Sequence, residues 1–434
     1  MKRLLVIVPD GVGVRNYLYS NFVQELQKHN VEVLLYHQIS DVALKEIKKV
    51  QPSIVDIKSL PRFVEKAFPR LLRESLAYAR LLFNKKKLDN STVMDFWNGN
   101  QKGLKKKLLY RLAELLGTLF SLNYKLILII EKAYNNEVSK DKIINIINDD
   151  LELLKPDLIL NLHQRAPISA PIILVANKRK IPTATVIFSW DNVPKARLIS
   201  RYDTYFVWSE VMQKELALLY PEIDLNQIKV TGTPQFEFYF DNNIILTKET
   251  FFLQHGLNPT KKTVCYSAND ATSPYEPDYL SDICEVVSEM DETIRPQILF
   301  RRSPTDKSKR FDAVLEKYKG IIFSIDPDWR MDKGSEESFT SIYPSFNDVI
   351  LLVNTVRYSD VVINFGSTMA HDFAVLNKPC LYLNYNPIDN SIFTVEMAYK
   401  FQHFRTMQGL EAVGWLNSSE EIGEKIVQAL EHPH

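Results

Sequence analysis

The residues best suited to hold a charged ligand lie in the second half of the chain. A short apolar stretch is followed there by Gly366, Ser367, Thr368 and Met369. A glycine turn that opens a helix leaves backbone N–H groups without partners, hydroxyls add donors, and the helix dipole favours negative charge. Asp372, about one turn later, can accept hydrogen bonds from a ribose diol. The motif predicts a site for a nucleoside diphosphate; the alternative is an ordinary capped helix.

Two further apolar runs in the same half end in groups of similar character. Arg301 and Arg302 follow the run 297–300, and Ser267 follows the run 263–266. Guanidinium groups keep their charge and match the geometry of phosphate oxygens. We expect Arg301 and Ser267 to contribute to the predicted diphosphate site. The alternative for the arginines is a pair that only lies on the surface.

The first half of the chain offers candidates for proton transfer. Asp10 follows the apolar run 4–8, and His163 follows the run 158–162. A carboxylate or an imidazole at such a position can remove the proton of an incoming hydroxyl group. Alternatively, Asp10 caps the next helix and His163 has a structural role. The sequence leaves open which of the two would be the base.

Two loops of the first half are candidates for binding the molecule that carries this hydroxyl group. Gly11 and Gly13 form a tight turn whose backbone a phosphate or a sugar can approach closely, although Asn16 breaks the full GxGxxG pattern. Trp190 and Asp191 follow another apolar run and can offer a stacking plane and acceptor oxygens to a sugar. The alternatives are a plain strand-to-helix turn and a loop anchored by a buried tryptophan.

These loops need a scaffold that brings strand ends together, and the apolar pattern supplies one. Short apolar runs alternate with helix-length amphipathic segments, which is typical of parallel strands buried on both faces. We predict an α/β fold with two Rossmann-like, doubly wound lobes that face a central cleft, over residues 1–240 and 241–434. The predicted strands are 4–8, 31–36, 158–162, 183–188, 204–207, 228–230, 263–266, 297–300, 321–323, 361–363 and 380–383.

One region interrupts this alternation. Residues of about 60–148 read as successive helices with almost no strand, which predicts a helical insertion in the first lobe. It contains Lys85–Lys87 and a second lysine run at 105–107. One interpretation is a solvated face of a packed insertion. The other is a basic amphipathic surface, around 85–111, that meets an anionic membrane or a lipid-linked acceptor.

Composition excludes several classes of protein. The 434 residues carry 53 Lys+Arg and 53 Asp+Glu, so the net charge is zero and a nucleic-acid binder that works through bulk charge is not expected. Three cysteines without metal-binding spacing favour a reducing cytoplasm, with peripheral attachment at the inner face of the cell membrane as an alternative. No apolar stretch is long enough to predict a transmembrane helix.

Four segments together resemble the GT-B glycosyltransferases, in particular the branch that builds bacterial surface polysaccharides and lipopolysaccharides. They are SWDN (189–192), VTGTPQF (230–236), RRSPTD (301–306) and NFGSTMAHDFAVLNKP (364–379). The resemblance covers about residues 155–390. Its motifs are specific to the fold and to the donor site, not to one sugar.

The resemblance implies how the two lobes divide the reaction. The second lobe would bind a nucleotide sugar, with the helix at Ser367 and Thr368 on the diphosphate and Asp372 on the ribose. The first lobe would bind a glycan or lipid-linked acceptor, with Asp10 or His163 as base. A last helix, here about 418–430, usually returns to the first lobe. Members of the family typically need no metal and no cofactor, and inversion of configuration is the expected outcome.

One departure from the family pattern bears on the substrate. Polyol-phosphate polymerases of this fold carry Arg-Pro-His-Pro where this chain has Arg301-Arg302-Ser303-Pro304. The missing histidine favours a sugar transferase. The alternatives are a polyol-phosphate transferase, a nucleotide-sugar epimerase, and a non-catalytic protein that binds nucleotide or glycan.

Overall fold

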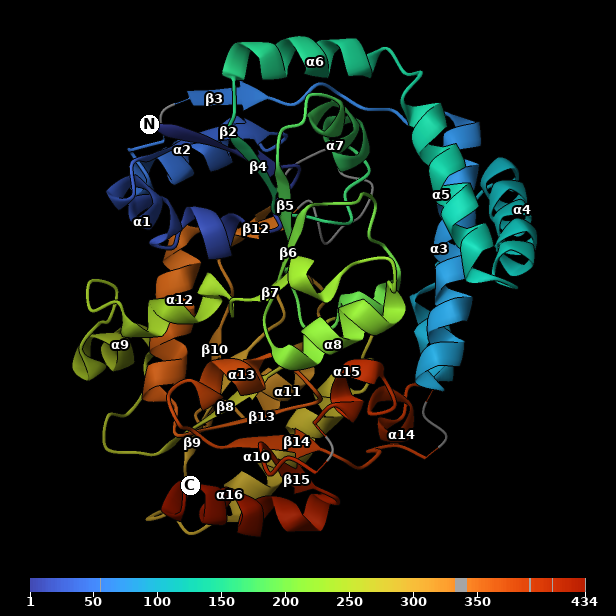
Figure 1. Ribbon diagram of the computed structural model, residues 1–434. Helices are drawn as coiled ribbons and strands as arrows, with labels where there is room; N and C mark the ends of the chain where they lie inside the picture. Colours follow the sequence, from blue (N-terminus) through green and yellow to red (C-terminus); the bar gives the residue numbers. More distant parts are fainter. Residues whose placement is uncertain (55, 332–341, 390–391, 408, 434) are drawn as a thin grey trace. The chain divides into compact units, whose positions relative to one another are not determined.

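The computed structural model describes residues 1–54, 56–331, 342–389, 392–407 and 409–433, and the chain divides into two compact units. The first contains Met1–Pro234 and Phe401–Thr406. The second contains the other described residues from Gln235 onward. We expected the boundary at 240, a few residues after its position in the structure. Figure 1 shows the sheet of each unit among its helices.

The sheet of the first unit is parallel throughout its described strands. Its order is β3-β2-β1-β4-β5-β6-β7, and the strands are β1 (Lys2–Val8), β2 (Val31–His37), β3 (Asp56–Ser59), β4 (Leu158–Asn161), β5 (Thr183–Val186), β6 (Thr204–Val207) and β7 (Ile228–Val230). In register, Val6 lies between Leu35 and Leu160, and all three are buried. Burial on both faces explains why these strands read as continuous apolar runs.

Helices cover this sheet and complete its core. They are α1 (Phe22–Lys28), α2 (Asp41–Val50), α6 (Ile143–Leu154), α7 (Ser169–Lys178) and α8 (Glu210–Leu219). Apolar side chains of α6, α7 and α8 pack with those of β1, β2 and β4 in one cluster of buried residues. The doubly wound α/β arrangement predicted for the first lobe is confirmed.

The predicted helical insertion is also confirmed. It consists mainly of α3 (Ala67–Leu88), a short 3-10 helix (Ser91–Phe96), α4 (Leu104–Phe120) and α5 (Tyr124–Val138), which lie together in Figure 1. The buried Arg80 joins two of its helices and ties it to the rest of the unit. Arg80 of α3 contacts Glu131 of α5 at 2.6 Å and Glu222, which follows α8, at 3.2 Å.

The second unit has its own parallel sheet and a short hairpin. The sheet order is β10-β9-β8-β13-β14-β15, with β8 (Thr263–Ser267), β9 (Gln297–Arg301), β10 (Ile322–Ile325), β13 (Val361–Asn364), β14 (Cys380–Leu383) and β15 (Gly414–Leu416). The hairpin pairs β11 (Trp329–Met331) with β12 (Ile342–Pro344). The helices of this unit are α9 (Lys248–His255), α10 (Glu276–Glu289), α11 (Asp312–Lys317), α12 (Phe346–Tyr358), α13 (Met369–Ala374), α14 (Val395–Ala398) and α16 (Ile422–Glu431), whereas α15 (Gln402–Arg405) belongs to the first unit.

The C-terminal part of the chain differs from the expectation. The last helix, α16, belongs to the second unit and packs near α10. Residues 401–406, which include α15, are instead grouped with the first unit. Phe401 lies 5.5 Å from Phe96, and His403 lies 4.8 Å from Trp190, measured between ring centroids. Aromatic packing therefore joins this short segment, rather than the last helix, to the first unit.

Candidate functional site

The strand order of the first sheet defines where a ligand is expected. From β1 the chain adds β2 and β3 on one side, and β4 to β7 on the other. The carboxyl ends of β1 and β4 therefore flank the point at which the order reverses, which is where open parallel sheets bind ligands. Asp10 follows β1 and His163 follows β4.

The structure brings these two candidate bases into a single pair. Asp10 Oδ2 lies 2.7 Å from His163 Nδ1, although the residues are 153 positions apart. Because a carboxylate only accepts hydrogen bonds, Nδ1 must carry the proton, which leaves Nε2 of the neutral ring as an acceptor. The other carboxylate oxygen, Oδ1, accepts from the backbone N–H of Val12 at 3.0 Å. The carboxylate is thus held from both sides and orients the imidazole.

The imidazole of His163 is fixed in place and has an unused nitrogen. The residue is 3% exposed, and its ring packs edge-on against Phe188 at 5.1 Å. Asn161 holds its backbone, accepting from the His163 N–H at 3.3 Å and donating to its carbonyl at 3.0 Å. Within the described part of the chain, buried Nε2 has no hydrogen-bond partner. A buried nitrogen without a hydrogen bond costs folding free energy, and a hydroxyl group of a ligand could donate the missing hydrogen bond.

The glycine turn after β1 brings the pair together. Gly13 has φ +82°, and a Cβ atom there would lie 2.9 Å from the Cβ of Leu162. Any other residue would strain the backbone and push the β1 loop away from the end of β4. The turn leads into a π-helical segment, Val14–Leu18, whose N-cap Gly13 makes no side-chain bond. Gly13 thus has a steric role here, and the approach of a ligand to Gly11 stays a prediction.

Trp190 and Asp191, the other predicted acceptor-side residues, are engaged within the first unit. Asp191 accepts from Ser189 at 2.7 Å and contacts Lys195 at 2.5 Å. Burial alone would raise the pKa of Asp191, but the charges of Lys195 and His403 hold it well below its usual range. The Trp190 ring meets His403 edge-on. This loop is internally braced, and its contact with a sugar stays a prediction.

A buried carboxyl group beside this loop yields a first prediction. Burial raises the pKa of Glu215 to about 7, with a smaller contribution from the charge of Asp191, against a hydrogen bond from Gln402. Because the carboxyl group of the unfolded chain titrates near the ordinary glutamate pKa of 4.5, the folded state loses stability as the pH rises from about 4.5 to about 7. We expect Glu215→Gln to be more stable than the wild type by about 2–3 kcal/mol at pH 8.

Denaturant unfolding at pH 4.5, 6 and 8 checks this expectation. The stability difference should be small at pH 4.5 and should reach its maximum above pH 7, where the wild-type carboxyl is ionised. A difference that does not change with pH would contradict the assignment of a raised pKa to Glu215.

The second sheet has an equivalent reversal point, between β8 and β13. Ser267 ends β8, and Gly366 follows β13 with φ +61°, a left-handed conformation that favours glycine. The two loops are joined by a hydrogen bond from the Asn269 side chain to the Phe365 carbonyl. The structure therefore places Ser267 and the 366–369 turn at adjacent strand ends.

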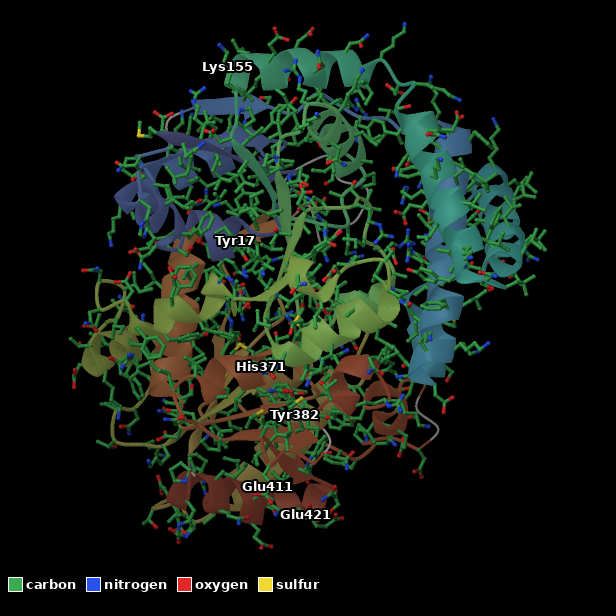
Figure 2. The ribbon with its side chains drawn as sticks, viewed as in Figure 1. Tyr17, Lys155, His371, Tyr382, Glu411 and Glu421 are labelled. Atoms are coloured by element: carbon green, nitrogen blue, oxygen red, sulfur yellow. The ribbon has the colours of Figure 1, made fainter. Side chains whose placement is uncertain are left out.

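The 366–369 turn is held by specific hydrogen bonds. Asn364 accepts from the Ser367 N–H at 2.7 Å, and the Tyr382 hydroxyl, labelled in Figure 2, donates to the Ser367 carbonyl at 3.1 Å. The Ser367 hydroxyl accepts from the Met369 N–H at 3.4 Å. Thr368 occupies the N-cap position of α13, with helical dihedral angles and no side-chain capping bond. The helix that follows, α13, spans Met369–Ala374.

Asp372 is buried within the second unit. It is 3% exposed and accepts from the Tyr239 hydroxyl at 2.9 Å and from Gln235 Nε2 at 3.3 Å. Both partners come from the 3-10 helix Pro234–Phe240, which includes the end of the VTGTPQF motif. Sequence reasoning did not connect the two motifs. The ribose contact of Asp372 stays a prediction.

Arg301 forms a buried ion pair that the sequence did not suggest. Its Nη2 atom lies 2.9 and 3.0 Å from the two carboxylate oxygens of Asp348, in the first turn of α12. Asp348 also accepts from Trp329 Nε1 at 2.7 Å and from the Asp328 N–H at 3.0 Å. Arg301 Nη1 is buried without a hydrogen-bond partner in the described residues. The guanidinium is therefore partly committed to the fold, with one nitrogen unused.

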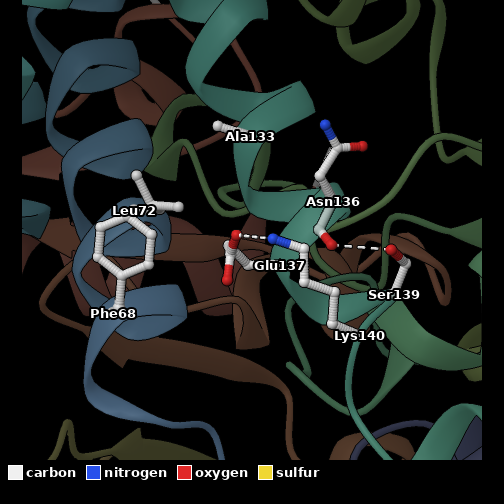
Figure 3. A pocket seen from close by; sticks show the side chains of 7 residues that line it. All are labelled: Phe68, Leu72, Ala133, Asn136, Glu137, Ser139 and Lys140. Carbon is white, nitrogen blue, oxygen red and sulfur yellow. Dashed lines mark hydrogen bonds and ion pairs between the residues drawn. The ribbon is translucent and has the colours of Figure 1, made fainter.

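A hollow elsewhere in the first unit is distinct from these strand ends. Figure 3 shows it between α3 and α5, with the Phe68 and Leu72 side chains on one side and the Glu137–Lys140 ion pair on the other. None of the predicted site residues lines it.

Over the described residues, no group of three or more His, Cys, Asp or Glu could hold a metal ion, and no helix has the length and apolarity to cross a membrane.

Comparison with known sequences finds a distant relative. No protein-family model matches the chain. A teichoic acid poly(ribitol-phosphate) polymerase of Bacillus spizizenii is 21% identical over 217 residues, which make up 49% of this chain. The match spans 30% of that protein's length.

Comparison with solved structures identifies the fold. UDP-GlcNAc 2-epimerase of Neisseria meningitidis, bound to UDP-GlcNAc, has a TM-score of 0.55 at 15% identity, over 100% of this chain and 92% of that one. The enzyme of the same name from Methanocaldococcus jannaschii has a TM-score of 0.54 at 14% identity, over 100% and 94%. These likenesses, with the two parallel sheets, show that the chain has an α/β fold of the GT-B type.

Proposed function

We propose that this protein is a glycosyltransferase of bacterial surface-polysaccharide synthesis. It would move a sugar from a nucleotide donor to a hydroxyl group of a glycan or a lipid-linked acceptor. The observation that carries the proposal is the Asp10–His163 pair, at the reversal point of the first sheet, with a buried and unpartnered Nε2 atom. An enzyme that transfers a sugar to a hydroxyl group needs a positioned base, and a histidine held by a carboxylate can act as such a base.

In the proposed reaction, His163 Nε2 takes the proton of the acceptor hydroxyl as the oxygen attacks the anomeric carbon. The bond from that carbon to the diphosphate oxygen breaks, and the nucleoside diphosphate leaves with the electron pair. Asp10 keeps the imidazole in the required tautomer and stabilises the imidazolium that forms. A single displacement of this kind inverts the anomeric configuration.

The donor would bind at the strand ends of the second unit. Backbone N–H groups and hydroxyls of Gly366–Met369 would meet the diphosphate, with Ser267 at the adjacent strand end. The ribose would contact Asp372 once its internal hydrogen bonds rearrange. We propose that the backbone N–H groups and hydroxyls, with Arg301, stabilise the negative charge of the leaving diphosphate and that no metal or cofactor is needed.

A test of the donor site uses a matched pair of variants. We expect Asp372→Ala to lower nucleotide affinity at least tenfold in calorimetry, because hydrogen bonds to a charged group are worth about 1.5–3 kcal/mol. Tyr239→Phe removes the 2.9 Å internal bond but keeps the carboxylate. It should bind nucleotide as well as the wild type, or better. Equal losses in both variants would mean that Asp372 only supports the fold.

A second candidate function is polyol-phosphate transfer, which the Bacillus spizizenii polymerase favours. The same base would then activate a polyol hydroxyl that attacks phosphorus and releases a nucleoside monophosphate. Ser303 stands against it, where the related polymerases carry histidine. A third candidate is epimerisation of a nucleotide sugar, which the fold likeness to 2-epimerases suggests.

Product analysis separates these reactions. Thermal-shift screening of nucleotides, nucleotide sugars and nucleotide-activated polyols first identifies the donor, since a ligand that binds the folded state raises its stability. The bound donor is then incubated with and without acceptor. A nucleoside diphosphate released only with acceptor supports the glycosyltransferase, a monophosphate the polyol-phosphate transferase, and an isomerised donor without acceptor the epimerase. Donor binding without any product would mean a non-catalytic protein.

A further inference from the structure

One face of α4 carries a row of leucines that no other described part of the chain covers. Six leucines of α4 and the residues after it are between 41% and 86% exposed. They form the leucine stripe: Leu104, Leu108, Leu112, Leu115, Leu119 and Leu122. Spacing of three and four residues keeps the five leucines that lie within α4 on one face of the helix, in an arc of about 80°, and Leu122 follows the helix end.

The orientation of α4 is fixed by its opposite face. Tyr110, Ala113 and Gly117 are buried against the rest of the helical insertion. A Cβ atom at Gly117 would lie 2.8 Å from the Ser75 carbonyl oxygen of α3, so the two helices are in close contact. Rotating α4 to hide its leucines would break this contact. The packing of the opposite face therefore directs the leucine stripe outward.

The charges beside the stripe all have one sign. Lys102, Lys105–Lys107 and Arg111 are exposed, and they gather at the first half of α4. Between 102 and 122, Glu114 is the sole acidic residue of the sequence, and it accepts from Trp97 Nε1 at 2.9 Å. On the helix surface Lys105, Lys107 and Arg111 flank the apolar stripe, Lys106 lies on the opposite side, and the only carboxylate of the segment is already engaged.

Charge complementarity selects the occupant of this surface. A second copy of the chain would bring the same cations and no free carboxylate from α4 to meet them. An anionic lipid bilayer offers both an apolar layer for the leucines and phosphate groups for the lysines. We propose that the leucine stripe and the cations beside it seat α4 on an anionic membrane surface. The helix lies in the plane of the membrane, and its leucines enter the boundary between headgroups and acyl chains.

This inference goes beyond the proposed function and does not depend on it, because vesicle binding requires neither nucleotide nor acceptor. The full-length protein is sedimented with vesicles of phosphatidylcholine alone, or with about a third phosphatidylglycerol. We expect binding to the anionic vesicles, at least tenfold weaker binding to the neutral ones, and weaker binding in high salt. Equal binding to both, or none to either, would overturn the proposal.

Two sets of variants test the residues. Leu108→Glu with Leu115→Glu, and separately Lys105→Gln with Lys106→Gln and Lys107→Gln, should each reduce binding to anionic vesicles at least tenfold. The control is Leu253→Glu, which changes a leucine of α9 that is even more exposed, at 84%, and should leave binding unchanged. Circular dichroism and thermal unfolding confirm that each variant is folded. A dimer in light scattering that the double leucine variant dissociates would show instead that the stripe joins two copies of the chain.

Discussion

His163→Ala lowers the transfer rate by about 10²–10⁴-fold and leaves donor affinity unchanged, if His163 is the base of the reaction. The alanine removes the Nε2 atom that takes up the proton. The hydroxyl group of the sugar acceptor therefore keeps its proton as it attacks. Donor affinity should persist, because the proposed donor groups belong to the second unit. Initial rates with saturating donor and calorimetric donor binding measure the two quantities.

Asp10→Asn tests the partner of the imidazole. An amide can present its N–H to Nδ1, which drives the proton to Nε2 and turns the base into a donor. We expect a loss of rate close to that of His163→Ala, and a double variant little slower than either single one, because the two residues act as a unit. Losses that multiply would show that they act separately.

A histidine at a neighbouring strand end provides the control. His37 ends β2, and its Nδ1 accepts from the Ile39 N–H at 3.3 Å. His37→Gln should retain the wild-type transfer rate. A His163→Ala variant that keeps more than about a tenth of the activity would remove His163 from the role of base.

The Asp10–His163 pair also shows which part of the site can be predicted from the sequence. Both residues were found because apolar runs buried on both faces stand out as continuous segments and each residue follows such a run. Their meeting could not be read from the chain, because it depends on β4 pairing beside β1 rather than beside β3. Sequence patterns locate strand ends, whereas strand order decides which ends are neighbours.

Short and polar elements were missed for a related reason. β3 has the sequence DIKS at the edge of its sheet, and β15 is only three residues long, so neither offers an apolar run. The partners of Asp372 and Arg301 lie on a 3-10 helix and in the first turn of α12. Gln235 and Tyr239 follow β7 and Asp348 follows β12, but which side chains they meet depends on tertiary packing that the sequence pattern does not show.

The ion pair between Arg301 and Asp348 leads to the second large effect. Both side chains are buried, so Arg301→Met leaves the carboxylate of Asp348 desolvated and without its counter-ion. Breaking a buried pair from one side typically costs about 3–5 kcal/mol. We expect Arg301→Met to destabilise the protein by that amount in denaturant unfolding.

A double variant separates the structural role of Arg301 from a role in donor binding. Arg301→Met with Asp348→Asn removes both charges and keeps an oxygen for the Trp329 N–H, so most of the lost stability should return. If the unused Nη1 reaches a phosphate oxygen, this folded double variant should still bind nucleotide at least tenfold more weakly than the wild type. Full affinity in the double variant would assign Arg301 to the fold alone, and the diphosphate would then rest on the backbone N–H groups of the 366–369 turn.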